Sequence, residues 1–215
     1  MVAPYYEEDG ITIYNADCRD VLPQLEPVDL VLTDPPYGIQ ANKAKAHSSI
    51  RDNANWPTGT WDNERPGKDT FDMFLLKSRA AAIWGGNYFA DLLPASSAWL
   101  CWRKPEAETG FSLADIELCW TSGDFAARCK TYARRDGNLH PTQKPLALMK
   151  WAISFFSEAQ TILDPFMGSG TTLVAAKALG LKAIGIEISK AYCDIAVERL
   201  RQRSLFSLPE LQEAA

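Results

Sequence analysis

The segment Asp34-Pro35-Pro36-Tyr37 combines hydrogen-bond acceptors, a rigid backbone and an aromatic ring within four positions. This set suits an amino group on an aromatic base, whose nitrogen is a poor nucleophile because its lone pair is delocalised into the ring. The Asp34 carboxylate and the Pro35 carbonyl could accept its N–H bonds and favour a pyramidal nitrogen. Tyr37 could stack on a base extruded from its helix. A proline-stiffened turn with a buried tyrosine is the alternative.

A second segment, residues 164–172, has the small residues of a tight turn between a strand and a helix. Gly168 and Gly170 would let a ligand approach the backbone amides at the helix start. No third glycine follows at Leu173 and no Gly-Lys-Ser/Thr is present, so the segment is neither a dinucleotide fingerprint nor a phosphate loop. We therefore expect a cofactor with a carboxylate or ammonium group, with a purely structural turn as the alternative.

Glu187 lies roughly 20 residues further on, at the end of the next predicted strand, where an acid commonly binds a ribose diol. This position favours a cofactor that contains a nucleoside. The alternative is an exposed acid that caps the following helix.

The elements that must hold these residues follow an α/β pattern. Two prolines end the predicted strand 28–33, so Asp34 should lie at a carboxyl strand end, where ligands bind in open α/β sheets. Further expected elements are strands over 11–16, 98–102, 116–120 and within 125–132, and helices over 19–25, 71–82, 87–93 and 146–156. The last part predicts a β-α-β-α unit and hence a parallel sheet, with a strand 161–164, helix 170–179, strand 181–187 and helix 189–201 with Ser189 as N-cap.

Composition narrows the class of protein. A chain of 215 residues with 47% hydrophobic content can bury one full core, and a net charge of −5 does not fit a protein that coats nucleic acid nonspecifically. Five scattered cysteines without a Cys-x-x-Cys pair predict neither a disulfide framework nor a zinc site, and suggest a reducing cytoplasm. We find no export signal and no apolar run near the ~18 residues of a membrane helix.

Taken together, these residues resemble the amino-group DNA methyltransferases that use S-adenosylmethionine, in the β-type order with the catalytic motif before the cofactor motif. The resemblance covers nearly the whole chain, through Asn15-Ala16-Asp17-Cys18, residues 33–38, His140-Pro141-Thr142-Gln143-Lys144-Pro145, residues 164–172 and Ile184-Gly185-Ile186-Glu187. It implies a single Rossmann-like methyltransferase domain over residues 1–203, followed by a tail, 204–215. The domain should have a mostly parallel twisted sheet, helices on both faces and a circularly permuted motif order.

The resemblance also implies roles for individual residues. Asp34, Pro35, Pro36 and Tyr37 would be catalytic; Asp17 would bind the cofactor adenine, Glu187 the ribose, and Asp164 with the 166–171 backbone the amino-acid part. The implied cofactor-binding set is Asp17, Cys18, Thr142, Lys144, Asp164, Pro165, Phe166, Gly168, Ser169, Gly170, Thr171 and Glu187. Transfer would run in line from a sulfonium to nitrogen, without a covalent enzyme intermediate or a metal.

The aspartate before Pro-Pro-Tyr resembles the N6-adenine members of the family more than the N4-cytosine members, which implies adenine N6 as the target. Cytosine N4, RNA and a protein glutamine stay open as targets, although the motif order speaks against the glutamine enzymes. A nucleic-acid-binding relic without catalysis is a further alternative, against which the intact Asp34, Tyr37, Asp164 and Glu187 argue.

The chain departs from the family pattern in its target-recognition region, since only about twenty residues separate Trp120 from His140. DNA contacts would then come from the loop 38–70, which we expect to be mobile, or from residues 128–144, where five basic residues face one acidic residue. The alternative for such charges is a solvated face. The candidate DNA-binding residues are Lys43, Lys45, Arg51, Arg134 and Arg135.

Other partners are suggested only at the chain end and by composition. Gln202-Arg203-Ser204-Leu205-Phe206 resembles the short peptide by which bacterial DNA-processing proteins bind the sliding clamp, with a fraying helix end as the alternative. The tryptophan content is compatible with a homodimer without locating an interface. The expected setting is the cytoplasm of a bacterium, with a bacterial or phage gene.

Overall fold

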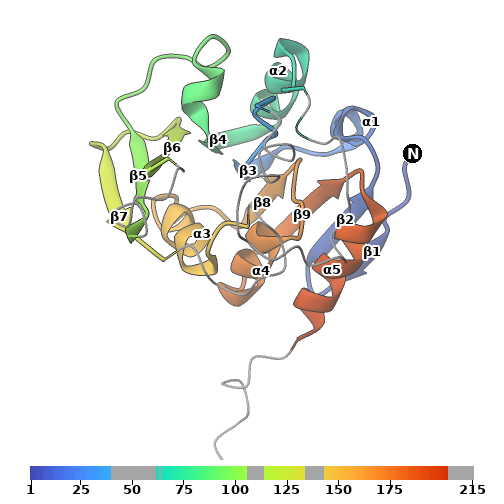
Figure 1. The fold of residues 1–215 in the computed structure, drawn as a ribbon. Coiled ribbons are helices and arrows are strands. Elements are labelled where there is room, and N and C mark those ends of the chain that lie inside the picture. Colours follow the sequence, from blue (N-terminus) through green and yellow to red (C-terminus); the bar gives the residue numbers. More distant parts are fainter. Residues whose placement is uncertain (40–61, 63, 106–113, 134–142, 203–215) are drawn as a thin grey trace, which may run out of the picture.

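A computed structural model describes residues 1–39, 62, 64–105, 114–133 and 143–202, in which one twisted sheet is covered by helices (Figure 1). The strands follow the order β1-β2-β9-β8-β3-β4-β6-β5-β7. Their bounds are β1 Tyr6–Glu8, β2 Ile11–Asn15, β3 Val28–Thr33, β4 Ser78–Trp84, β5 Trp99–Arg103, β6 Ile116–Thr121, β7 Arg128–Thr131, β8 Thr161–Asp164 and β9 Lys182–Glu187. The helices are α1 Cys18–Val21, α2 Lys68–Leu76, α3 Leu146–Ile153, α4 Thr171–Ala178 and α5 Lys190–Arg201, with 3₁₀ turns at Leu22–Gln24 and Gly86–Phe89.

The directions of the strands bring distant parts of the sequence to one edge of the sheet. β2, β9, β8, β3 and β4 are successive parallel neighbours, which confirms the expected mostly parallel sheet. β6 runs antiparallel to both β4 and β5, and β7 runs parallel to β5. The carboxyl ends of β3, β5, β7, β8 and β9 therefore lie at the same edge, together with the amino end of β6.

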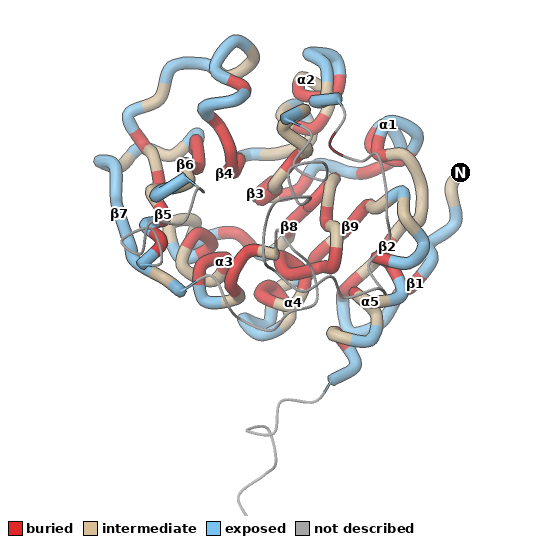
Figure 2. The backbone as a smooth tube through the Cα atoms, in the orientation of Figure 1, coloured by how far each residue is buried: buried red, intermediate tan, exposed pale blue. Residues whose placement is uncertain are grey.

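Strands β3 and β8 are largely buried (Figure 2). The apolar side chains of the sheet belong to two buried clusters, one on each face. In β3, Leu30 and Leu32 face the cluster that contains residues of α3, α4 and α5, while Val31 faces the cluster that contains residues of α1 and α2. Burial on both faces explains why the central strands read as continuous apolar runs. The expectation of helices on both faces is thus confirmed.

The prediction of a helix over residues 71–82 is wrong in its second half. Helix α2 already begins at Lys68, within the predicted loop 38–70, and ends at Leu76. The alanine-rich segment Ser78–Trp84 is the central strand β4, paired with β3 and β6. Alanines favour a helix locally, but neighbours on both sides and both faces decide the conformation here.

Two smaller elements also differ from expectation. The helix predicted over 87–93 is a 3₁₀ turn at Gly86–Phe89. Strand β1 was not predicted; it forms a hairpin with β2 through Asp9 and Gly10, whose φ angles of 51° and 77° fit a two-residue turn. Within the described ranges no helix is long and apolar enough to cross a bilayer.

Candidate active site

The ends of β3 and β8 bring the two predicted segments together. Thr33, the last residue of β3, donates from Oγ1 to Asp164 Oδ1 at 2.7 Å, although these residues are 131 positions apart in the sequence. Pro35 and Pro36 follow Asp34 and cannot continue the ladder, so the chain leaves the sheet here. Asp34 and Asp164 therefore lie on neighbouring strand ends, as the sequence predicts.

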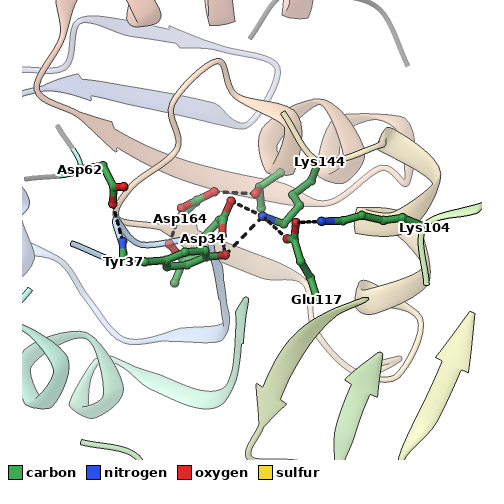
Figure 3. Close-up of polar contacts among 9 residues, drawn as sticks. Asp34, Tyr37, Asp62, Lys104, Glu117, Lys144 and Asp164 are labelled. Carbon is green, nitrogen blue, oxygen red and sulfur yellow. Dashed lines mark hydrogen bonds and ion pairs between the residues drawn. The ribbon is translucent and has the colours of Figure 1, made fainter. Parts of the chain in front are cut away.

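Both carboxylate oxygens of Asp34 have donors (Figure 3). The hydroxyl of Tyr37 donates to Oδ1, and the Lys144 ammonium forms an ion pair with Oδ2. Lys144 Nζ also lies 3.5 Å from the Tyr37 hydroxyl and 5.9 Å from the ring centroids of both Tyr37 and Trp84. Lys144 is thus a buried cation beside Asp34 and Tyr37.

The Tyr37 ring is fixed from several sides. It stacks on Tyr88 with centroids 4.7 Å apart and an interplanar angle of 15°, and Phe89 meets it edge-on. The buried carboxylate of Asp62 accepts from the backbone N–H groups of Tyr37 and Gly38 at 2.8 and 2.9 Å. Because Tyr88 covers one face of the ring, at most the other face can stack on an extruded base.

Lys144 has a second acidic partner, Glu117, near the start of β6. Its Nζ lies 3.0 Å from Glu117 Oε2, and the other oxygen, Oε1, pairs with the ammonium of Lys104. Burial raises the pKa of Glu117, but the attraction of Lys144 and Lys104 outweighs it and holds the pKa at about 2. For Lys144, burial lowers the pKa, and the attraction of Asp34 and Glu117 outweighs it, so the pKa is raised. Glu117 and Lys144 therefore stay charged at neutral pH.

Asp164 organises the turn formed by residues 164–172, which we call the glycine turn. Its carboxylate accepts from the Thr33 hydroxyl, from the Phe166 N–H at 3.1 Å and from the Thr172 hydroxyl. Burial raises the pKa of Asp164 to about 6, although these three hydrogen bonds act in the opposite direction. The Asp164 carboxylate thus links the start of α4 to the end of β3 through hydrogen bonds.

Replacing Asp164 with asparagine should change the pH dependence of stability. An unfolded chain holds this carboxyl near its ordinary pKa of about 3.9, so the folded state binds the proton more tightly between about pH 4 and 6. Protonation of Asp164 as the pH falls through this window stabilises the folded state, and its ionisation above about pH 6 destabilises the folded state. Asp164→Asn should therefore be more stable than the wild type at pH 7.5, on the order of 1–3 kcal/mol, and lose this advantage towards pH 4.5. Urea unfolding of both proteins at both pH values measures the difference in their free energies of unfolding. An equal difference at pH 7.5 and pH 4.5 would contradict the raised pKa of Asp164.

Glu187 connects the end of β9 to the glycine turn. Its carboxylate accepts from the Gly168 N–H at 3.1 Å and from the Ser189 N–H at 2.7 Å. Burial raises the pKa of Glu187. A carboxylate has about four lone-pair sites, so two remain for a ligand diol. A Cβ added at Gly168, where φ is +51°, would meet no heavy atom within 4 Å, so there is open space beside the turn.

The remaining predicted cofactor residues occupy the same strand ends but have structural partners. Asp17 caps α1 by accepting from the Arg19 N–H at 2.9 Å and also pairs with the Arg19 guanidinium. Cys18 is buried, and burial raises the pKa of its thiol to about 12, which makes it unreactive. Ser169 and Thr171 both accept from Arg199 of α5, at 3.1 Å at their hydroxyls. Pro165 is buried and Phe166 half-buried.

Other predicted residues lie outside the described part of the chain. These are Thr142, Lys43, Lys45, Arg51, Arg134 and Arg135, together with residues 203–206 of the clamp-like peptide and the tail 204–215.

Several residues at this site were not predicted from the sequence: Lys104, Glu117, Asp62, Tyr88 and Arg199. Glu117 is the one charged residue of β6, and a charged residue is usually exposed to solvent. Its partners Lys104 and Lys144 are 13 and 27 positions away, on other elements, so no local spacing reveals the pairing. The Gly85-Gly86 pair before Tyr88 was the one available signal of close packing.

The chain is similar in sequence to known DNA methyltransferases. The N6/N4 methyltransferase family, described as DNA methylase, matches residues 96–198, which contain Lys144, the glycine turn and Glu187. The Type II methyltransferase M2.LlaDCHI of Lactococcus lactis subsp. cremoris is 27% identical over an alignment that covers 97% of this chain and 96% of the relative.

Solved structures show the same fold. The crystal structure of the M1.HpyAVI–SAM complex has a TM-score of 0.59 and 23% identity, covering 89% of this chain and all of the other. The cytosine-N4-specific PvuII DNA methyltransferase has a TM-score of 0.65 and 16% identity, covering 94% of this chain and 90% of the other. The arrangement of strands and helices is therefore that of a methyltransferase fold.

Proposed function

We propose that this chain, which belongs to the family of N6/N4 DNA amino-methyltransferases, transfers a methyl group from S-adenosylmethionine to N6 of adenine in DNA. The observation that carries the proposal is the placement of Asp34 beside the glycine turn, at the ends of adjacent strands β3 and β8. An amine-binding carboxylate and a candidate cofactor turn are thereby parts of one site.

The residues at the strand ends fit S-adenosylmethionine. Glu187 can offer its free lone pairs to a ribose diol, and the amides at the start of α4 suit a carboxylate. The open space beside Gly168 allows a ligand to lie against the backbone. Bound here, the cofactor would supply a methyl group on a positively charged sulfur. The M1.HpyAVI structure, a complex with SAM, shares this fold.

The residues of the chain would act mainly by position. Asp34 and the Pro35 carbonyl accept the two N–H bonds of the target amine and direct its lone pair towards the glycine turn. The Asp34 carboxylate would stabilise the positive charge that the target nitrogen gains when it takes the methyl group. The nitrogen then loses a proton to water. Holding the reactants in attack geometry can supply about 7–11 kcal/mol of the barrier.

The choice of adenine rests on Asp34, since an aspartate before Pro-Pro-Tyr resembles the N6-adenine members more than the N4-cytosine members. Cytosine N4 is the second candidate, because the fold is also that of the cytosine-N4-specific PvuII enzyme. Incubation with labelled S-adenosylmethionine and two duplex mixtures, one with every adenine replaced by N6-methyladenine and one with every cytosine replaced by N4-methylcytosine, separates them. Label entering the second mixture alone supports adenine, and label entering the first alone overturns it.

We infer that DNA contacts the exposed edge strand β7. Its residues Arg128 and Lys130 are both exposed. The carboxyl end of β7 lies on the same side of the sheet as the carboxyl end of β3, which precedes Asp34. The predicted basic residues Arg134 and Arg135 follow it in the sequence. Positive side chains at this place can pair with DNA phosphates.

Reversing both charges, Arg128→Glu with Lys130→Glu, should weaken DNA binding and reduce the slope of log affinity against log salt by about 2. Fluorescence anisotropy with labelled duplex DNA across a salt series measures the slope. Lys182→Glu is the matched control, because Lys182 is exposed at the amino end of β9, on the opposite edge of the sheet. An unchanged slope in the double variant would remove β7 from the DNA interface.

A further inference from the structure

We propose that Glu117 is a positioning residue of the methyl-transfer site, which holds the Lys144 ammonium so that Asp34 can exchange it for the amino group of the target base. This inference deepens the proposed function and rests on it. It assigns a purpose to a half-buried acid outside both predicted motifs.

The inference starts from a chain of alternating charges, formed by Lys104, Glu117, Lys144 and Asp34 (Figure 3). The lysine side chains are only 4% and 7% exposed, and the acids 23% and 25%. Strand direction explains how they meet. Lys104 follows the carboxyl end of β5, Asp34 that of β3, and Glu117 lies near the amino end of antiparallel β6, so all reach the same edge.

At Oδ2 of Asp34, the substrate amine competes with a donor that is already there. That oxygen is paired with the Lys144 ammonium, which is chemically similar to the amine that the reaction requires there. A buried ammonium left without a partner would be strongly destabilised, so its release needs another anion within reach. Glu117 Oε2 provides it at 3.0 Å, on the other side of the same Nζ. Lys144 can therefore keep one carboxylate while it leaves the other.

Lys104 limits how firmly Glu117 holds Lys144. It pairs with Oε1, which leaves Oε2 for Lys144, so each oxygen of Glu117 serves one cation. The four charges sum to zero, and shifting Lys144 between its two acids changes no net charge in the buried site. Because the pKa of Glu117 is held at about 2, this second anion is present at neutral pH.

A purely structural role for the ion pairs of Glu117 predicts different behaviour. The pairs would then hold β5 and β6 against the segment before α3, and their loss would lower the free energy of unfolding without a specific effect on the transfer step. If Glu117 instead serves as a second anionic partner for Lys144, removing the Glu117 charge should keep Lys144 paired with Asp34. Lys144 would then compete there with the target amine. Removing the Lys144 charge should then relieve the defect.

The experiment measures single-turnover methyl transfer to duplex DNA at saturating S-adenosylmethionine. Glu117→Gln, which keeps the shape and removes the charge, should lower the rate at least about tenfold, with DNA and cofactor affinities within about twofold of the wild type. The double variant Glu117→Gln with Lys144→Met should be faster than Glu117→Gln. Glu198→Gln, an acid-to-amide change at an exposed position of α5, is the matched control and should leave the rate unchanged.

Glu117→Gln also removes the charge that pairs with Lys104, so a second variant tests whether a fall in rate reflects a loss of folding. Glu117→Gln with Lys104→Met removes the pair together and should show the same fall in rate. A folded variant lacking the Glu117 charge that transfers within twofold of the wild-type rate would overturn the inference. So would a Glu117/Lys144 double variant slower than Glu117→Gln. Failure of the wild type to methylate DNA would instead overturn the proposed function, and the inference with it.

Discussion

Replacing Asp34 with alanine is expected to lower the rate of methyl transfer by about 100- to 1,000-fold, the usual effect of removing one preorganised group that stabilises transition-state charge. The Asp34 carboxylate would accept hydrogen bonds from the target amine, and the Tyr37 hydroxyl donates to its Oδ1. Lys144 keeps Glu117 as a partner in this variant, so the buried cation is not left alone. Single-turnover transfer of a labelled methyl group to DNA measures the loss.

Two controls separate chemistry from folding in this experiment. Calorimetric affinity for S-adenosylmethionine should stay within about threefold, because Glu187 and the glycine turn are intact. Glu26→Ala, at an exposed acid away from the carboxyl edge, should transfer at the wild-type rate. Undiminished methylation by Asp34→Ala would refute the assignment of Asp34.

Replacing Gly85 with alanine should damage both stability and activity. Gly85 has a φ of +69°, and a Cβ there would lie 2.1 Å from Cε1 and 2.4 Å from Cζ of Tyr37. The backbone strain and the displaced ring should together cost about 1–3 kcal/mol. Because a shift of about 1 Å in a catalytic group can cost 100-fold in rate, methyl transfer should fall at least about tenfold.

Gly67→Ala is the matched control for this prediction. A Cβ at Gly67 would meet nothing within 4 Å, and the residue precedes α2 with a φ of −77°, which any residue adopts. Its free energy of unfolding should change by less than about 1 kcal/mol. Urea unfolding and transfer assays of both variants give the comparison. Equal effects at Gly67 and Gly85 would mean that Tyr37 is not held by the backbone at Gly85.

Local signals in the sequence were strongest where strand, turn and helix follow without interruption. The prolines after Asp34 end β3, and the glycines between β8 and α4 allow the turn, so both segments were predicted with their strand-end positions. The same regularity predicted the β-α-β-α order of residues 161–201. Such signals depend only on neighbouring residues, which is why a sequence can carry them.

Features that depend on tertiary neighbours were missed. Strand β4 contains three consecutive alanines, and only its place between β3 and β6 makes it a strand. Likewise, Glu117 resembles a surface residue until β5 and the segment before α3 bring Lys104 and Lys144 to it. The stacking of Tyr88 on Tyr37 also joins two loops 51 positions apart. Long-range pairing of this kind leaves no spacing pattern in one sequence.

The most direct test of the central claim, that Asp34 and the glycine turn form one site for methylating adenine in DNA, is the product itself. The chain would be expressed in a bacterial host that lacks its own DNA methylation, and nucleosides from the host DNA analysed by mass spectrometry. Wild-type protein should produce N6-methyladenine, and Asp34→Ala should leave the DNA unmodified. N4-methylcytosine in place of N6-methyladenine, or equal methylation by both proteins, would contradict the account.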